Sequence, residues 1–303
     1  MNRRTTLALL ALAASLATPL ATRAVRAQPP AELRIEPERP VSGTLFRVVV
    51  RPEGGMRPTG GTVSGEPLHF TQNADGTWSS FGATRVGSDS VRVRVTLAGD
   101  GRTEERGLRV RLARGDYVLE RLSVAPKYGG PPDSAVVAKM KAESIAVARV
   151  VRESHAREAL WRGGWQAPRP GRVTSGFGNG RQFNGVVQSR HTGVDFAGAV
   201  GAPVRAPNRG IVALVDRFHL GGNVVYLDHG AGLTTAYLHL SATDVAVGDT
   251  VEAGQVIGKV GQTGRVTGPH LHWIARYGAV TFDGRGLLRL GQQSSADSPR
   301  PAR

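Results

Sequence analysis

The C-terminal part of the chain, from about residue 170, is a series of short apolar segments separated by glycines. Segments rich in Val, Ile, Leu and Tyr recur, and turn sequences such as Asp228-His229-Gly230-Ala231-Gly232 separate them. Short apolar runs between glycine turns are typical of β-strands joined by tight hairpins. We expect strands at residues 210–215, 223–227, 233–239, 256–260 and 271–275. The pattern therefore predicts a glycine-rich antiparallel β domain over residues 170–285.

Residues 31–125 also have a β pattern, but with different spacing. Short, partly alternating strands are expected near 45–50, 66–70 and 90–95, with turn clusters between them. Such spacing is typical of a small β-sandwich, immunoglobulin-like in outline. Nothing in this segment forms a catalytic pattern, and we expect its single histidine, His69, to be structural.

A helix is predicted between the two β segments, over residues 133–161. Asp133-Ser134 can cap its start, the segment from Ala135 to Trp161 has no Gly or Pro, and apolar residues recur at helical spacing. His155 lies among charged residues and is expected to be solvated. The predicted fold is therefore mainly β: an immunoglobulin-like sandwich, a linking α-helix and a glycine-rich antiparallel β domain.

The N-terminus has the pattern of a signal peptide over residues 1–27. Arg3 and Arg4 precede a short apolar run, and Val25-Arg26-Ala27 fits a small-x-small cleavage site. An uncleaved anchor is the alternative, and the arginine pair leaves Sec and Tat export both open. No other stretch is long and apolar enough to span a membrane. We predict export to the periplasm or cell envelope, and a disordered basic tail at 286–303.

Composition limits the chemistry and the partners of an exported chain. The sequence has no cysteine, so any metal site must use histidine and carboxylate ligands. The formal charge of +15 favours anionic partners such as cell-wall carboxylates and phosphates, although an arginine-rich proteome would give the same charge. Export and the absence of a basic-aromatic platform exclude nucleic acid as the expected partner. We expect a monomer.

Three short stretches concentrate the histidines of the C-terminal segment. In GPHLHW, residues 268–273, His270 and His272 lie on one face of a strand, which is typical of a half-exposed sheet or of part of a metal site. In YLHLS, residues 237–241, alternation predicts Tyr237 and His239 on a functional face, with Leu238 and Leu240 on the core face.

The third stretch, RHTGVDF at residues 190–196, adds His191 and Asp195. A catalytic zinc site needs about three protein ligands and a nearby base, and His191, Asp195 and His272 could be the ligands, with His239 and His270 left for proton transfer. In a straight strand, however, residues four apart are about 13 Å apart. Gly193 must therefore permit a bend that brings His191 and Asp195 together.

These motifs, in this order, resemble the lysostaphin/LytM-type zinc endopeptidases. The stretches SGFG (175–178), HTGVDFAG, NVVYLDHGAGLTTAYLHLS and VGDTVEAGQVIGKVGQTGRVTGPHLHW carry the resemblance over about residues 170–283. It implies a LytM-type domain, with His191, Asp195 and His272 as Zn²⁺ ligands and His239 and His270 as the catalytic pair. It also implies a zinc metalloendopeptidase that cuts stem peptides or cross-links of peptidoglycan.

Two other interpretations compete with this one. A catalytically silent relative that binds the wall or activates another hydrolase would be expected to lack some of the five functional residues, and all are present here. A lipoyl-type carrier would match the glycine turns but would leave the histidines unexplained. One difference from many family members is the segment NGRQFNGVVQS at 179–189, which replaces an Arg/Pro-containing loop. We expect that segment to line the substrate groove, so the cleaved bond is not implied. His229 and His219 are not expected to be catalytic.

Overall fold

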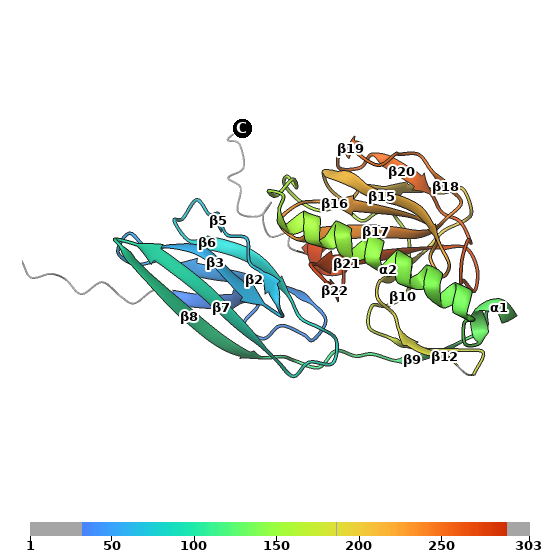
Figure 1. Ribbon diagram of the computed structural model, residues 1–303, viewed down its shortest axis with the longest axis horizontal. Helices are drawn as coiled ribbons and strands as arrows, with labels where there is room; N and C mark the ends of the chain where they lie inside the picture. The colour runs from blue at the N-terminus through green and yellow to red at the C-terminus, as the bar shows by residue number, and fades with distance from the viewer. Residues whose placement is uncertain (1–31, 186, 290–303) are drawn as a thin grey trace, which may run out of the picture.

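The computed structural model describes residues 32–185 and 187–289. Figure 1 shows two β-rich domains side by side, with the long helix α2 lying across the second. The predicted mainly β fold is confirmed. The predicted signal peptide and residues 290–303 of the tail predicted at 286–303 lie outside the described residues. Residues 286–289 are helical and Leu287 is buried in the core, so the tail does not begin at residue 286.

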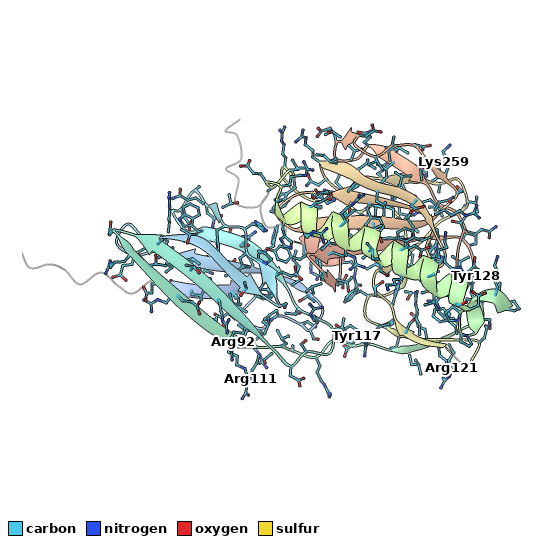
Figure 2. The ribbon with its side chains drawn as sticks, in the orientation of Figure 1. Arg92, Arg111, Tyr117, Arg121, Tyr128 and Lys259 are labelled. Atoms are coloured by element: carbon cyan, nitrogen blue, oxygen red, sulfur yellow. The ribbon has the colours of Figure 1, made fainter. Side chains whose placement is uncertain are left out.

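The N-terminal domain is a sandwich of two four-stranded antiparallel sheets, with the orders β1-β2-β6-β5 and β4-β3-β7-β8. Its strands are β1 (Glu32–Glu36), β2 (Leu45–Arg51), β3 (Arg57–Val63), β4 (Glu66–Pro67), β5 (Thr71–Gln72), β6 (Trp78–Ala83), β7 (Ser90–Gly99) and β8 (Arg102–Arg111). Alternation along β7 shows why the sandwich forms. Val93 and Val95 are buried, whereas Arg92 and Arg94 are exposed; Arg92 is labelled in Figure 2. One face of the strand therefore enters the core and the other meets solvent.

The helical segment contains a short helix, α1 (Pro126–Gly129), and the long helix α2 (Ser134–His155). Asp133 caps α2 by accepting a hydrogen bond from the Val136 N–H at 2.8 Å. The helix ends at His155, before the expected residue 161: the Ala156 N–H donates to the Glu153 carbonyl at 3.1 Å, which tightens the last turn. Farther along, the Leu160 N–H donates to the His229 carbonyl at 2.8 Å. Among the described residues, no helix is long and apolar enough to cross a membrane.

The C-terminal domain is built on an eight-stranded sheet with the order β10-β13-β21-β17-β16-β15-β19, in which β22 also pairs with β21. Two three-stranded sheets, β12-β11-β9 and β14-β20-β18, adjoin it. The strands are β9 (Leu119–Leu122), β10 (Val173–Ser175), β11 (Gly180–Phe183), β12 (Val187–Arg190), β13 (Val194–Ala197), β14 (Pro203–Arg205), β15 (Gly210–Phe218), β16 (Gly222–Asp228), β17 (Leu233–Leu240), β18 (Ala242–Thr243), β19 (Thr250–Val251), β20 (Val256–Lys259), β21 (His270–Tyr277) and β22 (Val280–Phe282).

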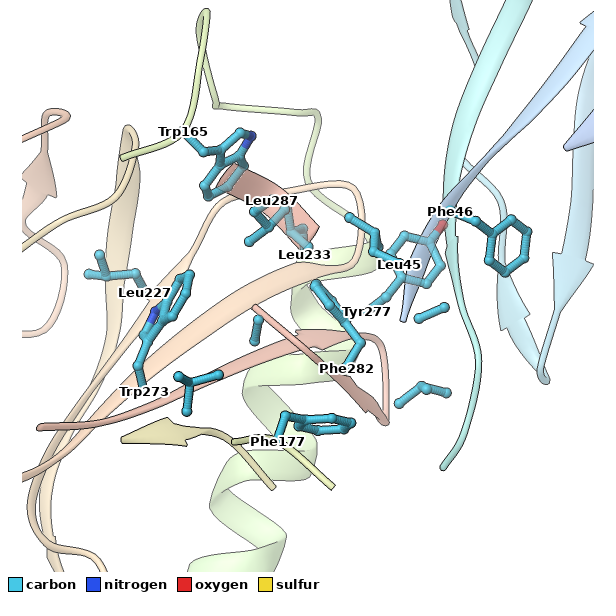
Figure 3. Packing of buried hydrophobic residues seen from close by; sticks show 14 of the residues in the cluster. Leu45, Phe46, Trp165, Phe177, Leu227, Leu233, Trp273, Tyr277, Phe282 and Leu287 are labelled. Atoms are coloured by element: carbon cyan, nitrogen blue, oxygen red, sulfur yellow. The ribbon is translucent and has the colours of Figure 1, made fainter. Parts of the chain in front are cut away.

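The two faces of the large sheet have different partners. One face carries Trp273 and Tyr237 into the main core. Figure 3 shows this core from Trp273 through Phe282 to Leu45 of the sandwich. The opposite face carries a smaller apolar cluster that packs against Val150 of α2. The helix therefore covers part of the same sheet face that carries His272, because residues 272 and 274 of β21 point to one side and Ile274 belongs to that cluster.

Polar contacts as well as the shared core join the two domains. His69 Nε2 and His155 Nδ1 are 2.8 Å apart, and His155 Nε2 lies 3.1 Å from Glu66 Oε2. The Tyr277 hydroxyl donates to the Pro67 carbonyl at 2.6 Å. The expectation that His155 is solvated is therefore wrong: its ring lies between the sandwich and the sheet. Tyr117 lies at the same junction, near the middle of Figure 2, and its hydroxyl donates to the Ser42 carbonyl.

Candidate metal centre and active site

The register of the large sheet brings the predicted metal-binding residues together. β13 pairs antiparallel with β21 so that Asp195 lies opposite His272. β21 pairs in turn with β17, and Leu238 lies opposite His272 on that side. The carboxylate of the third motif and the second histidine of HLH therefore lie on neighbouring strands, although 77 positions separate them in the sequence.

A bend between β12 and β13 brings His191 close to Asp195. Residues 191–193 lie outside both strands, and His191 Nε2 is 3.0 Å from Asp195 Oδ1. A Cβ atom on Gly193 would lie 2.4 Å from the Trp273 carbonyl oxygen and 2.9 Å from the His272 ring. The predicted bend is present, and glycine is needed at Gly193 because the backbone there packs directly on β21.

Three candidate ligand atoms lie within hydrogen-bonding distance of one another, but they carry too few protons to form hydrogen bonds between all of them. The Nδ1–H of His191 donates to the Gly176 carbonyl at 2.7 Å, so its Nε2 has a lone pair. That nitrogen is 3.0 Å from Asp195 Oδ1 and 2.9 Å from His272 Nδ1, which are themselves 2.7 Å apart. While both imidazoles are neutral, at most one proton lies among the three atoms.

A metal cation would resolve this arrangement. Ligand atoms held 2.0–2.1 Å from a tetrahedral zinc ion are roughly 3.3 Å apart, close to the observed spacing. Two imidazoles and one carboxylate are also a donor set that zinc accepts. His191, Asp195 and His272 therefore form a group that could hold a metal ion, and all three residues are buried.

His239 and His270 lie beside this group, each oriented by its backbone. His239 donates from Nδ1 to the Thr263 carbonyl at 2.8 Å, and His270 donates from Nδ1 to the Gly268 carbonyl, also at 2.8 Å. The centres of the two rings are 4.9 Å apart, and the His270 Nε2 is 3.7 Å from Asp195 Oδ1. Both rings therefore keep a free Nε2 lone pair next to the candidate ligands.

A bulge in β17, rather than strand alternation, places His239 in the site. Asn223 pairs with Leu240 and Val225 with Tyr237, so two steps along β16 lie opposite three steps along β17. His239 has a left-handed backbone, with φ of 65°, which is costly for a non-glycine residue and is often found at functional sites. The predicted alternation was wrong here, since Tyr237 is buried in the main core whereas Leu238 lines the hollow beside His239.

Burial sets the charge state of these groups. It lowers the pKa of His272 to about 4, and Asp195 offsets only part of this effect. It also lowers the pKa of His239, which the charges of His272 and His270 depress further. Burial raises the pKa of Asp195, but the contacts with His191 and His272 outweigh it and hold that pKa well below its ordinary value. At neutral pH the imidazoles of His239 and His272 are therefore neutral and the Asp195 carboxylate is ionised. A neutral imidazole and an ionised carboxylate are the forms that bind metals.

Two residues outside the predicted metal-binding motifs, Arg181 and Glu120, fix the orientation of Asp195. Arg181 on β11 donates from Nη2 to Asp195 Oδ2 at 2.5 Å and from Nε to Glu120 Oε2 at 3.0 Å. Glu120 on β9 also accepts hydrogen bonds from Ser175 at 2.6 Å and from Asn179 at 2.8 Å. The Asp195 Oδ2 atom is thereby occupied, and Oδ1 is left facing the two histidines.

Neither Glu120 nor Arg181 belongs to a metal-binding motif. β9 follows the sandwich in the chain, yet it pairs in parallel with β11, so that Glu120 lies beside Arg181. The sequence contains one signal for Arg181: it closely follows SGFG and lies in the 179–189 segment that is expected to line the groove. It contains no such signal for Glu120.

Two hollows flank the site. One, of about 540 Å³, is lined by residues including Glu120, Thr174 and His270, and the other, of about 180 Å³, by residues including Ser189, His239 and His272. The segment predicted as a groove-lining loop at 179–189 is largely a hairpin of β11 and β12, and residues of both strands line the second hollow. Arg265 lines both hollows, with its guanidinium 3.8 Å from the centre of the Phe183 ring.

The two remaining histidines of the domain lie away from the candidate ligands. His229 is fully buried, donates from Nδ1 to the Arg209 carbonyl at 2.8 Å, and accepts at Nε2 from the Thr235 hydroxyl at 2.8 Å. His219 packs against Tyr128 of α1, with ring centres 5.3 Å apart. Both positions agree with the expectation that neither residue is catalytic.

Comparison with known proteins gives a family match for the region that contains His191, Asp195 and His272. Residues 189–284 match the family model described as Peptidase family M23. Residues 189–284 therefore form an M23 peptidase domain. Arg181 and Glu120 both precede the matched residues, so part of the structure that holds Asp195 lies outside them.

The alignments with the curated relatives cover only part of this chain and only part of each relative. The DD-carboxypeptidase/endopeptidase Mpg of Neisseria meningitidis serogroup B is 50% identical over 86 residues, which are 28% of this chain and 20% of the relative. The glycyl-glycine endopeptidase ALE-1 of Staphylococcus capitis is 45% identical over 100 residues, 32% of this chain and 28% of the relative. The alignments thus span between a fifth and three tenths of these relatives.

One solved structure is similar over most of the chain. It is a Pseudomonas aeruginosa crystal structure assigned to peptidase M23, and it covers 82% of this chain and 95% of its own. Its TM-score is 0.63 and its sequence identity 24%, so the likeness concerns the fold alone. The arrangement of sandwich, helix and M23 domain therefore has a close structural precedent.

Proposed function

We propose that this protein is an exported zinc-dependent endopeptidase that hydrolyses peptide bonds of peptidoglycan. The observation that carries the proposal is the convergence of His191, Asp195 and His272, whose candidate ligand atoms lie 2.7–3.0 Å from one another, beside the two further imidazoles. A wall-binding relative without activity would have no need for the free Nε2 atoms of His239 and His270.

In this proposal His191, Asp195 and His272 hold Zn²⁺. Bound zinc would polarise a peptide carbonyl and acidify a water molecule. The sandwich, the helix and the M23 domain would act together, because Glu120 from the segment after the sandwich fixes Arg181, and Arg181 fixes Asp195.

His239 and His270 would move the proton during hydrolysis. Each has its Nδ1–H bound to a backbone carbonyl, so only Nε2 is free to accept a proton from water and to return it to the leaving amine. The protonated ring would also stabilise negative charge on the carbonyl oxygen. The two rings are equivalent in this respect, and the general base is one of them.

The substrate class follows from the relatives and the charge. Mpg is named for DD-carboxypeptidase and endopeptidase activity and ALE-1 for glycyl-glycine endopeptidase activity, so the family can cut different bonds. The formal charge of +15 suits an anionic wall polymer. We therefore propose the peptide portion of peptidoglycan as substrate, without assigning the bond.

Digestion of purified peptidoglycan, followed by mass analysis of the soluble products, tests the function. The protein should release peptide-containing fragments, a chelator should abolish the release, and added Zn²⁺ should restore it. The masses of the fragments identify the bond. Retention on peptidoglycan with no release in the presence of Zn²⁺ would favour the silent wall-binding alternative, and undiminished release in chelator would exclude zinc.

A further inference from the structure

A large cavity lies between helix α2 and the sheet, away from the candidate ligands. It has a volume of about 770 Å³ and runs past Met140 and Val147 of α2 to Glu66 and Pro67 of the sandwich. We call it the trough. Phe218, Tyr226 and Leu238 form much of its apolar wall on the sheet side. Because both the helix and the sheet are well ordered elements, the trough is part of the fold rather than a gap between loops.

The trough adjoins the active site. Leu220, Gly221 and Leu238 line both the trough and the hollow that contains His239 and His272. A ligand bound at the candidate metal centre could therefore extend along the sheet face into the trough without leaving the protein surface.

Arg276 is the unusual residue of the trough. It lies on β21 four residues after His272, on the same face, which corresponds to about 13 Å along the strand. Its Nε atom is buried and has no hydrogen-bond partner among the described residues. Burial lowers the pKa of its guanidinium. A buried donor of a cationic group without an acceptor is costly, so the Arg276 guanidinium is suited to bind an anion.

Neither acidic residue that lines the trough forms a salt bridge with Arg276 among the described residues. Glu66 Oε2 lies 3.1 Å from His155 Nε2, and Glu143 accepts from the His219 backbone N–H at 2.7 Å. The other charged residue among the lining, Arg152, is also a cation. The trough therefore offers an apolar wall and an unneutralised guanidinium.

We propose that the trough is a subsite of the catalytic groove for a substrate side chain that is aliphatic and ends in a carboxylate, which binds Arg276. The inference rests on the proposed peptidase function and adds a specificity determinant to it. The aliphatic part would bury against Val147, Phe218 and Leu238, and the carboxylate would accept hydrogen bonds from the guanidinium fork.

The test compares two forms of one polymer. Purified peptidoglycan is digested before and after its free carboxylates have been converted into amides with a carbodiimide and ammonia. The protein should digest the untreated polymer at least about tenfold faster, since a charge-assisted hydrogen bond to a buried group has this effect on binding. R276M should digest both forms at the same low rate, and R276K should retain part of the preference.

Matched variants separate this effect from the general charge of the protein. R217M removes an exposed arginine of β15 and should keep the full preference. A148W fills the trough from an exposed helix position and should lose the preference, whereas A142W, on the same helix but outside the trough, should not. Thermal unfolding and zinc content show that each variant is folded.

Each outcome of this test decides between the two proposals. If neither polymer is digested by the unaltered protein loaded with Zn²⁺, the proposed function fails. If both are digested equally, or if R276M and A148W keep the preference, the peptidase function stands and the subsite is excluded.

Discussion

Glu120 and Arg181 form a salt bridge with a distance of 3.0 Å between Glu120 Oε2 and Arg181 Nε, and both side chains are mostly buried. Glu120 comes from the segment that follows the sandwich, and Arg181 contacts Asp195 at 2.5 Å. The connection between the domains thus contributes to the candidate metal centre. Outer partners of this kind fix the orientation of a ligand and tune its affinity for metal.

We predict that Glu120→Gln weakens zinc binding about tenfold and that Glu120→Ala weakens it further, because Arg181 would be free to turn away from Asp195. Zinc affinity is measured by competition with a chelating dye. Glu104→Gln, an exposed change on β8, is the matched control and should leave the affinity unchanged. Unaltered affinity in Glu120→Ala would show that the salt bridge only supports the fold.

The two histidines of HLH should separate into different roles. His272→Ala removes a candidate ligand, so zinc affinity should fall at least about a hundredfold, and activity should be lost with it. His270→Ala should keep zinc and lose activity by about 10²–10⁴-fold, since only proton transfer is affected. Metal content after dialysis and the rate of peptidoglycan digestion are measured on the same samples. An active, zinc-loaded His272→Ala protein would contradict the scheme.

Regular strands were predictable from the sequence, and irregular ones were not. Alternation correctly placed His270 and His272 on one face, because β21 has an unbroken side-chain period of two at that point. It failed for Tyr237, because the bulge in β17 and the left-handed backbone of His239 reverse the faces. A bulge depends on the partner strand, which a single segment does not encode.

Long-range pairing limited the prediction of the site in another way. The motifs identified the candidate ligands because each motif carries its own chemistry. Glu120 is an ordinary charged residue, and it reaches the site only because β9 pairs with β11 about 60 residues later in the chain. For the same reason, the sequence pattern alone assigns residues 119–125 to the sandwich, whereas Leu119–Leu122 pair with β11 of the C-terminal domain.

Gly193→Ala should destabilise the protein and disturb the metal centre together. The added Cβ would lie 2.4 Å from the Trp273 carbonyl oxygen, so β13 and β21 would have to move apart, at a cost of about 3 kcal/mol. Thermal unfolding and zinc affinity should both decrease. The control is Gly107→Ala on β8, where the nearest atom to the added Cβ is 3.8 Å away, and its stability should be unchanged or slightly higher. Equal unfolding temperatures for the two variants would contradict the packing argument.

His229 should make the stability of the domain depend on pH. Burial lowers its pKa to about 4, whereas the pKa is about 6.5 in the unfolded chain. Between these values the unfolded state binds one more proton, so stability is complete above pH 6.5 and falls as the pH decreases toward 4. The total loss from this residue is on the order of 3 kcal/mol, and it levels off below pH 4.

The His229→Gln variant isolates this contribution from that of other buried histidines. A glutamine can still donate to the Arg209 carbonyl and accept from the Thr235 hydroxyl, but it does not titrate. The free energy of unfolding is measured in denaturant from pH 7.5 to pH 4 for both proteins with the metal removed. The difference between them should shrink by about 3 kcal/mol over this range, because only the unaltered protein has the buried imidazole that resists protonation. Parallel curves would mean that His229 takes up its proton in the folded state at ordinary pH, with the Thr235 hydroxyl turned away from Nε2.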